Sequence, residues 1–147
     1  MIVLYDADCG FCRWAMAWVV RHDRRGRIRS VPIQSPLGAE LLADLDPPGR
    51  LRSAHVIRVD GSRCSGGAAV AEVLSALPRT FALGRLARGL PGTTDLLYRA
   101  IAARRETVGR LVGAAARRRA DELLAAARTT TSAELAALDS RSRYRPS

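Results

Sequence analysis

The chain has 147 residues and a net charge of +10 at pH 7, and all 24 of its basic residues are arginine. This length suits one domain with at most a small appendage. Three cysteines are too few for a disulfide scaffold, no run of 18 apolar residues is present to span a membrane, and the N-terminus lacks a signal-peptide pattern, so we expect a cytoplasmic protein.

The positive charge gathers in the second half of the chain. Residues 1–77 hold ten arginines against eight acidic residues, whereas residues 78–147 hold fourteen against six. Few aromatic residues that could stack on bases accompany the arginines of the second half. We therefore expect a solvated basic face and do not expect nucleic-acid binding.

Residues 1–34 predict a strand, a helix and a second strand. Residues 2–5 form a short apolar run, and the segment from Cys9 to about Arg24 has the wide apolar coverage of a helix that packs on a sheet. A basic stretch and a glycine then end the helix, and residues 27–34 alternate between apolar and polar. This order predicts a right-handed crossover between two parallel strands.

Residues 35–78 predict a second helix, a hairpin and a third helix. They complete an α/β core of order βαβαββα with a mixed four-stranded sheet. Proline and glycine mark the helix ends, and an Asp-Gly pair marks the hairpin turn. The expected elements are a helix from Ser35-Pro36 to Asp46-Pro47-Pro48-Gly49, strands over residues 54–59 and 63–65 joined at Asp60-Gly61, and a helix over about residues 68–77.

After Pro78 the chain becomes helical and rich in arginine. We expect helices over residues 80–89 and 94–127, which form a helical C-terminal extension that completes the domain over residues 79–128. Residues 129–147 are expected to be a flexible tail. An apolar stripe on these helices comprises Leu97, Ile101, Val108, Leu111, Val112, Leu123 and Leu124.

The most informative motif is Cys9-Gly10-Phe11-Cys12, which closely follows the first strand. Two cysteines three positions apart lie one helical turn apart, so their sulfurs can close a disulfide or open to a dithiol. A helix that begins at Cys9 directs its free N–H groups and its positive dipole end at that sulfur, which favours the thiolate. The motif predicts redox chemistry, and a buried structural pair or half of a zinc site are the alternatives.

With this motif the chain resembles the DCC family of thiol-disulfide oxidoreductases, named for the pattern Asp-x-x-Cys-x-x-Cys, which here runs from Asp6 to Cys12. The resemblance covers about residues 1–113 and implies a thioredoxin-like fold. The family's activity is inferred largely from this motif, so the resemblance does not determine the substrate. From the dithiol we expect exchange with a protein disulfide or a low-molecular-weight thiol, without a cofactor and with glutathione as a candidate reductant. Further matching pieces are Arg24-Arg25-Gly26-Arg27-Ile28, Val31-Pro32-Ile33-Gln34-Ser35, Asp60-Gly61 and Tyr98-Arg99-Ala100-Ile101-Ala102.

One position departs from the family pattern. Such proteins commonly carry glycine directly after the first aspartate, where this chain has Ala7. If the backbone takes a positive φ at this position, the alanine would strain the loop.

Cys9, nearer the helix start and solvent, is the expected attacking thiolate, and Cys12, one turn further in, is expected to resolve the mixed disulfide. Asp6 and Asp8 work against an acidic Cys9, because a nearby carboxylate disfavours a second negative charge. Their alternative roles are a helix cap for Asp8 and a proton relay or loop anchor for Asp6. Arg13 could offset the two acids or be solvated.

Two further places are candidate substrate-binding positions. His55 stands where thioredoxin-like proteins usually place a proline that faces the dithiol. It is a candidate hydrogen-bond donor to the thiolate, a metal ligand, or a partly buried strand histidine. Gly66 and Gly67 precede a helix at the position where glutaredoxins receive the carboxylate of glutathione, although a tight strand-to-helix turn explains two glycines equally well.

Cys64 lies on the predicted returning strand and is expected to be structural. It could instead join Cys9, Cys12 and His55 in a zinc site of three thiolates and one imidazole. Because strand order 2-1-3-4 would put Cys64 on a strand remote from the first helix, we expect no metal there.

Overall fold

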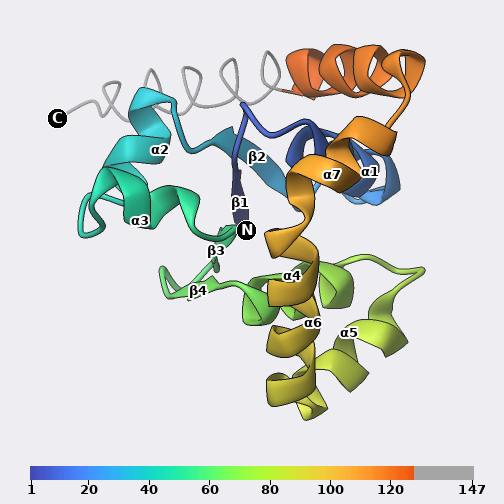
Figure 1. Ribbon diagram of the computed structural model, residues 1–147. Coiled ribbons are helices and arrows are strands. Elements are labelled where there is room, and N and C mark those ends of the chain that lie inside the picture. Colours follow the sequence, from blue (N-terminus) through green and yellow to red (C-terminus); the bar gives the residue numbers. More distant parts are fainter. Residues whose placement is uncertain (128–147) are drawn as a thin grey trace, which may run out of the picture.

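The computed structural model describes residues 1–127, except for the side chain of Glu106, and shows a four-stranded sheet surrounded by helices (Figure 1). The expected flexible tail, residues 129–147, lies outside the described residues. The strands are β1 (Ile2–Tyr5), β2 (Arg29–Pro32), β3 (His55–Ile57) and β4 (Arg63–Ser65). The helices are α1 (Gly10–His22), α2 (Pro36–Leu41), α3 (Pro47–Leu51), α4 (Gly67–Ala76), α5 (Phe81–Gly89), α6 (Pro91–Ala103) and α7 (Arg105–Leu111), followed by a helix over residues 114–127.

The sheet has the order β2-β1-β3-β4, which confirms the predicted arrangement. β1 pairs in parallel with β2, and α1 makes the crossover between them. β3 runs antiparallel to β1, with Val3 opposite Val56, and β4 runs antiparallel to β3. Because β1 and β3 are antiparallel, the C-terminal end of β1 lies beside the start of β3. The motif that follows β1 is therefore built at this edge of the sheet.

Alternate residues of β1 face two separate hydrophobic cores. Val3 and Tyr5 pack with Val56 against Met16 of α1 and Val73 of α4. The neighbouring residues of β1 point to the other face, where α2 and α3 cover a second core. That core contains Leu4, Val31, Ile33 and Leu42, with Ile2, Leu37, Leu41, Leu45, Leu51 and Ile57 packed around it.

The segment between β2 and β3 differs from the prediction. Ser35 caps α2 by accepting a hydrogen bond from Gly38 N (3.0 Å), but α2 ends at Leu41. The Asp-Pro-Pro-Gly segment that was expected only to end a helix begins α3, because Asp46 accepts a hydrogen bond from Gly49 N (3.0 Å) and Pro47 occupies the first turn. The same residue types end one helix and start the next.

The C-terminal helices also differ from the prediction. The expected long helix is divided into α6, α7 and the helix over residues 114–127. Most of the expected apolar stripe is exposed, including Leu97, Ile101 and Leu111, because α6 turns Tyr98 rather than its leucines toward the core. Leu124 is the exception: it is buried and joins the core beneath α1, together with Ala120.

Among residues 1–127, no helix is both long enough and apolar enough to cross a bilayer.

Candidate functional site

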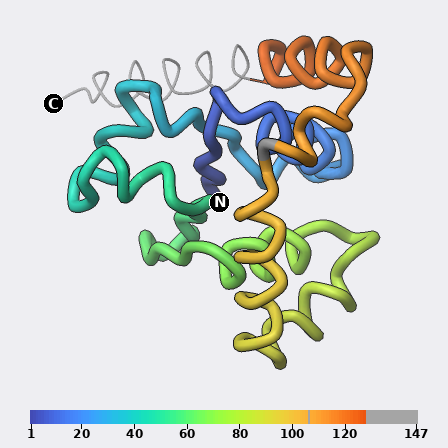
Figure 2. Tube along the Cα trace, viewed as in Figure 1, coloured from blue at the N-terminus to red at the C-terminus, as the bar shows by residue number. Residues whose placement is uncertain are grey.

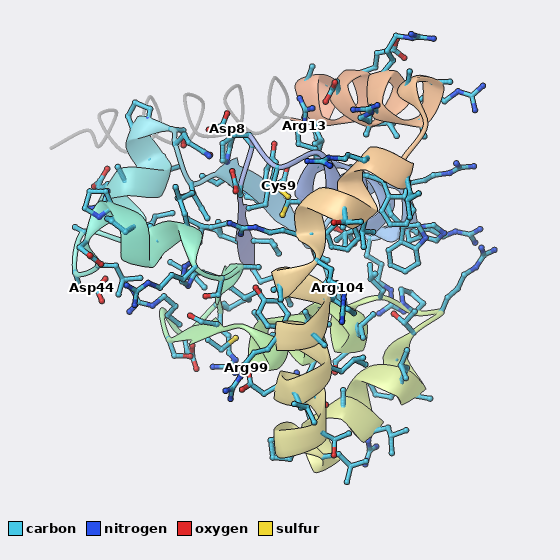
Figure 3. All side chains as sticks on the ribbon, in the orientation of Figure 1. Asp8, Cys9, Arg13, Asp44, Arg99 and Arg104 are labelled. Atoms are coloured by element: carbon cyan, nitrogen blue, oxygen red, sulfur yellow. The ribbon has the colours of Figure 1, made fainter. Side chains whose placement is uncertain are left out.

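The two cysteines of the motif lie together at the start of α1, as expected. Cys9 is the N-cap of this helix, and its Sγ accepts a hydrogen bond from the backbone N–H of Cys12 (3.3 Å). Both thiols are free and partly buried. Figure 3 shows Cys9 beside Asp8 and Arg13 at the upper edge of the sheet. The helix start therefore presents a backbone donor and its positive dipole end to the sulfur of Cys9.

The environment of Cys12 keeps its thiol protonated. Burial raises the pKa of Cys12 far above its ordinary value, and the hydrogen bond to Cys9, the charge of Cys9 and the carboxylate of Asp6 raise it further. The guanidinium of Arg105 acts in the opposite direction. The two sulfurs are therefore inequivalent: Cys12 holds its proton most firmly while Cys9 is negatively charged.

Asp6 and Asp8 are held by Gln34, a residue to which the sequence pattern assigns no role. Gln34 Nε2 donates to Asp6 Oδ1 (2.7 Å) and to Asp8 Oδ2 (3.1 Å), and Gln34 Oε1 accepts from Ala7 N (3.1 Å). Asp6 also accepts from the backbone N–H of Asp8 (3.0 Å). Asp6 is thus a loop anchor. Asp8 is not the helix cap, because Cys9 occupies that position.

Ala7 fits this loop without the backbone strain that a positive φ would cause. Among the described residues, no residue other than glycine has a positive φ, so alanine meets no steric penalty here. Its methyl group instead packs against the core that contains Tyr5. The departure from the family pattern is therefore compatible with the local backbone.

The C-terminal helices return to cover the dithiol segment (Figure 2). A methyl group at Gly109 of α7 would lie 3.2 Å from the backbone nitrogen of Phe11, so α7 packs closely on the residues between the two cysteines. The Arg117 side chain, from the helix over residues 114–127, lies beside Gly10. Arg13 forms a partly exposed ion pair with Asp121 of that helix (3.3 Å), and no ion pair joins it to the acids of the loop among the described residues.

Tyr98 and Arg105 are site residues that the sequence pattern did not assign. The Tyr98 hydroxyl accepts a hydrogen bond from the backbone N–H of Ala54 (2.9 Å), at the position before β3, and burial raises the pKa of Tyr98. Arg105 donates to the backbone oxygen of Leu51 (3.1 Å), and its charge acts on Cys12. Tyr98 belongs to a segment that resembles the DCC family, which was the one available signal.

His55 does not contact the dithiol. It pairs with Leu4 across the sheet, so its ring lies on the face that α2 and α3 cover. Nε2 donates to the Arg50 oxygen (3.0 Å), which leaves Nδ1 of the neutral ring to accept from the Ser65 hydroxyl (2.7 Å). Burial lowers the pKa of His55 and thus favours this neutral form. Both ring nitrogens therefore take part in hydrogen bonds within the fold, which corresponds to the alternative of a histidine buried in a strand.

The start of α4 already holds a carboxylate from the chain itself. Gly66 has φ of 63°, and a methyl group at Gly67 would lie 2.7 Å from Asp95 Cα, so α4 and α6 approach closely at this point. A methyl group at Gly66 would lie 3.3 Å from Asp95 Oδ1, so this carboxylate is beside the start of α4; the Arg99 guanidinium, and to a smaller extent the Gly67 N–H, lowers the pKa of Asp95. The carboxylate of glutathione would therefore have to displace Asp95 to bind there.

Cys64 lies on β4, at the far edge of the sheet, opposite Val56. Burial raises its pKa, and the charges nearest to it belong to Arg58, Glu72 and Arg88. Within residues 1–127, no group of three or more His, Cys, Asp or Glu side chains is arranged to hold a metal ion. The four candidate zinc ligands are thus not brought together.

Aromatic side chains extend from the dithiol along the exposed side of α1. Phe11 stands between the two cysteines, and its ring lies 6.1 Å from that of Trp14. Trp14 is 40% exposed and Trp18 is 36% exposed, although tryptophan is largely buried in most folded proteins. The Trp18 ring stacks at 4.3 Å on His22. Phe11, which is only partly exposed, is followed at helical spacing by Trp14 and Trp18, and we call these three side chains the aromatic face.

The chain is similar to one known protein family over most of its length. A family model described as DCC1-like thiol-disulfide oxidoreductase matches residues 3–111. The match includes the dithiol, Gln34, Tyr98, Arg105 and Gly109, and it ends before the helix over residues 114–127. Neither the curated proteins nor the solved structures contain a match to the chain.

Proposed function

Because the chain belongs to the DCC1-like thiol-disulfide oxidoreductase family, we propose that it reduces disulfide bonds in polypeptides through Cys9 and Cys12. The observation that carries this proposal is the placement of Cys9 as the cap of α1, where its sulfur accepts the Cys12 N–H. A thiolate is stabilised by such a donor and by the positive end of a helix. We place the activity in a reducing, cytoplasmic setting, which suits a chain without a disulfide scaffold.

The first step forms a mixed disulfide. The Cys9 thiolate attacks one sulfur of the substrate disulfide, a new S–S bond joins Cys9 to that sulfur, and the other substrate sulfur leaves as a thiolate and takes a proton from solvent. Cys9 no longer carries charge at this stage. Two of the causes that raise the pKa of Cys12 then disappear, namely the charge of Cys9 and the hydrogen bond to it.

The second step closes the protein disulfide. Cys12 gives up its proton and attacks Cys9 Sγ, so the Cys9–Cys12 bond forms and the second substrate thiol is released. The substrate gains two electrons and two protons, and the protein loses both thiol hydrogens. Arg105 is placed to favour the Cys12 thiolate at this step, because its guanidinium acts to lower the pKa of that thiol.

A polypeptide substrate is favoured by the aromatic face. Exposed tryptophan and phenylalanine side chains are typical anchors of binding surfaces. Since Phe11 lies between the two cysteines, a chain that rests on Phe11, Trp14 and Trp18 would bring a neighbouring disulfide to Cys9. A small thiol is too short to use this surface.

A thiol must return the oxidised protein to the dithiol, and glutathione is our proposed donor. One glutathione thiolate would attack Cys9 Sγ from solvent and release the Cys12 thiol, and a second would attack the glutathione sulfur of the mixed disulfide, so that the Cys9 thiol and glutathione disulfide are released. The start of α4 does not contribute to this reaction in the proposal, because the Asp95 carboxylate already lies beside it.

Turnover of two disulfides tests the proposal. Wild type should reduce both insulin and hydroxyethyl disulfide in the presence of glutathione, and Cys9→Ser should reduce neither. Trp14→Ala should lower kcat/KM for insulin by about tenfold, which is the loss of one aromatic anchor, and leave the small disulfide unaffected. Leu86→Ala, on a distant helix, is the matched control. Equal losses for both substrates in Trp14→Ala would contradict recognition by the aromatic face, and a fully active Cys9→Ser would contradict the proposed chemistry.

A further inference from the structure

The helices α5 and α6 carry a large apolar surface that faces solvent. In Figure 1 the turn between them forms the lower end of the molecule, whereas α1 and α7 lie near the top. Five leucines here are each between 50% and 69% exposed. A surface of this kind on a soluble domain usually marks a place of association. We call it the leucine face, and it comprises Leu83, Leu86, Leu90, Leu96 and Leu97.

The packing of α5 shows that its leucines point outward together. The inner side of α5 is marked by Gly84, where a methyl group would lie 2.3 Å from Ser75 N of α4. Leu86 is two positions on, about 200° around the helix, and therefore points away from α4. Leu83, Leu86 and Leu90 follow one another at helical spacing, so they line the same side of α5.

The packing of α6 continues this surface. Tyr98 marks its inner side through the hydrogen bond to Ala54 N. Leu96 is two positions earlier and so points outward. Leu97 lies one turn after Thr94, whose hydroxyl donates to the Ala87 oxygen of α5 (2.9 Å). Leu97 therefore borders the seam with α5, on the side away from α4, whereas Leu96 lies on the other outward flank of α6.

Positive charge surrounds the leucine face. Residues 79–104 contain five arginines and one acidic residue, Asp95, which is paired with Arg99. Arg79, Arg85 and Arg104 have no ion-pair partner among the side chains that the structure describes. Figure 3 labels Arg99 on α6 and Arg104 at the C-terminal end of this helix, nearer the middle of the molecule. The surface thus combines leucines with guanidinium groups and almost no negative charge.

We propose that the α5–α6 hairpin lies on an anionic lipid surface, with the leucine face in the headgroup region and Arg85 and Arg104 against lipid phosphates. Amphipathic helices that carry leucine and arginine bind such surfaces through buried apolar area together with electrostatic attraction. A second copy of the chain fits less well, because two surfaces with unpaired arginines would be brought together, although Arg88 is paired with Glu72 of α4. A projecting hairpin end also suits a broad surface better than a groove. The dithiol would then face away from the lipid.

Co-sedimentation of the full chain with vesicles tests this proposal. Wild type should bind vesicles of equal parts phosphatidylglycerol and phosphatidylcholine, bind pure phosphatidylcholine weakly, and lose binding as the salt rises from about 0.05 to about 0.5 M. The double variant Leu86→Ser, Leu97→Ser should lower the partition coefficient at least about tenfold, the loss expected when two side chains no longer enter the lipid. The control Leu111→Ser, which changes an 81% exposed leucine on α7, should bind as wild type does.

Two further variants keep the result decisive. Arg85→Gln combined with Arg104→Gln should weaken binding to anionic vesicles while all five leucines remain. Cys9→Ser should bind as wild type does, so that loss of redox activity and loss of lipid binding are separate results. No binding of wild type to anionic vesicles, equal binding to neutral ones, or a wild-type dimer that the leucine double variant dissolves would each overturn the proposal.

Discussion

The helices α1 and α4 lie on the same side of the sheet, and the start of each packs against a helix from the second half of the chain. α1 starts at Cys9 under α7, and α4 starts at Gly67 against α6. Both starts offer the free N–H groups that favour an anion. At α1 the group beside these donors is a thiol, which can react with a disulfide, whereas at α4 it is the Asp95 carboxylate, which cannot. A helix start therefore becomes a reactive site only through the group that occupies its donors.

The largest effect is expected at the first of these starts. Cys9→Ser should lower disulfide reduction by about 10³-fold or more, since it removes the group that attacks the substrate. Cys12→Ser should allow the attack but stop at the mixed disulfide, which intact-mass spectrometry would detect as a stable adduct on Cys9. An adduct that accumulates in Cys9→Ser instead would reverse the roles of the two cysteines.

Glycine-to-alanine substitutions compare how tightly α6 packs on the start of α4 and α7 on the start of α1. Gly67→Ala should lower the free energy of unfolding by about 1–3 kcal/mol, because its methyl group would lie within 2.8 Å of backbone atoms of Asp95. Gly109→Ala should stay within about 1 kcal/mol of wild type, because its closest approach is 3.2 Å and alanine favours the helix. Urea denaturation measures both values. Equal losses would show that the two helix contacts are equally tight.

The pH dependence of the free energy of unfolding tests the surroundings of His55 on β3, the strand before the hairpin that leads to α4. The folded pKa of His55 lies below its unfolded value, so the unfolded chain binds the proton first as the pH falls. The His55 contribution is therefore complete above about pH 6.5 and is lost below it, with a slope of at most about 1.4 kcal/mol per pH unit. His55→Gln should flatten this part of the curve. An unchanged slope in that variant would assign the titration to another group.

The smallest effect is expected when the carboxylate beside the start of α4 is removed. Asp95→Asn removes the carboxylate from the Gly67 N–H and the partner from Arg99, so the reaction of the oxidised protein with glutathione should rise a few-fold at low salt. Stopped-flow measurement of glutathione consumption would follow it. Asp60→Asn, which removes the same charge at the hairpin turn, is the control. An equal rise in both variants would reflect net charge rather than the start of α4.

Local patterns in the sequence were sufficient for much of the fold and for the dithiol. The strands at residues 2–5 and 63–65 have the predicted bounds, because short apolar runs and an Asp-Gly turn determine them locally. The partners of the site could not be predicted in this way. Tyr98 reaches a backbone group 44 residues away, and Arg105 reaches one 54 residues away.

The two glycines before α4 show the same limit. Two adjacent glycines at a helix start are typical of an anion-binding site. Here the carboxylate beside them belongs to Asp95 of α6, and nothing in the sequence around Gly66 indicates this contact. The function of such a helix start depends on tertiary contacts, whereas the cysteine that caps α1 is visible in the motif itself.

The most direct test of the central claim is a redox titration of the full chain in glutathione buffers, with intact mass as the readout. We predict a reversible loss of two hydrogens with a midpoint between about −120 and −300 mV. Peptide mapping should place the new bond between Cys9 and Cys12, with Cys64 still a thiol. The absence of a reversible disulfide in this range, or a bond that requires Cys64, would contradict the account.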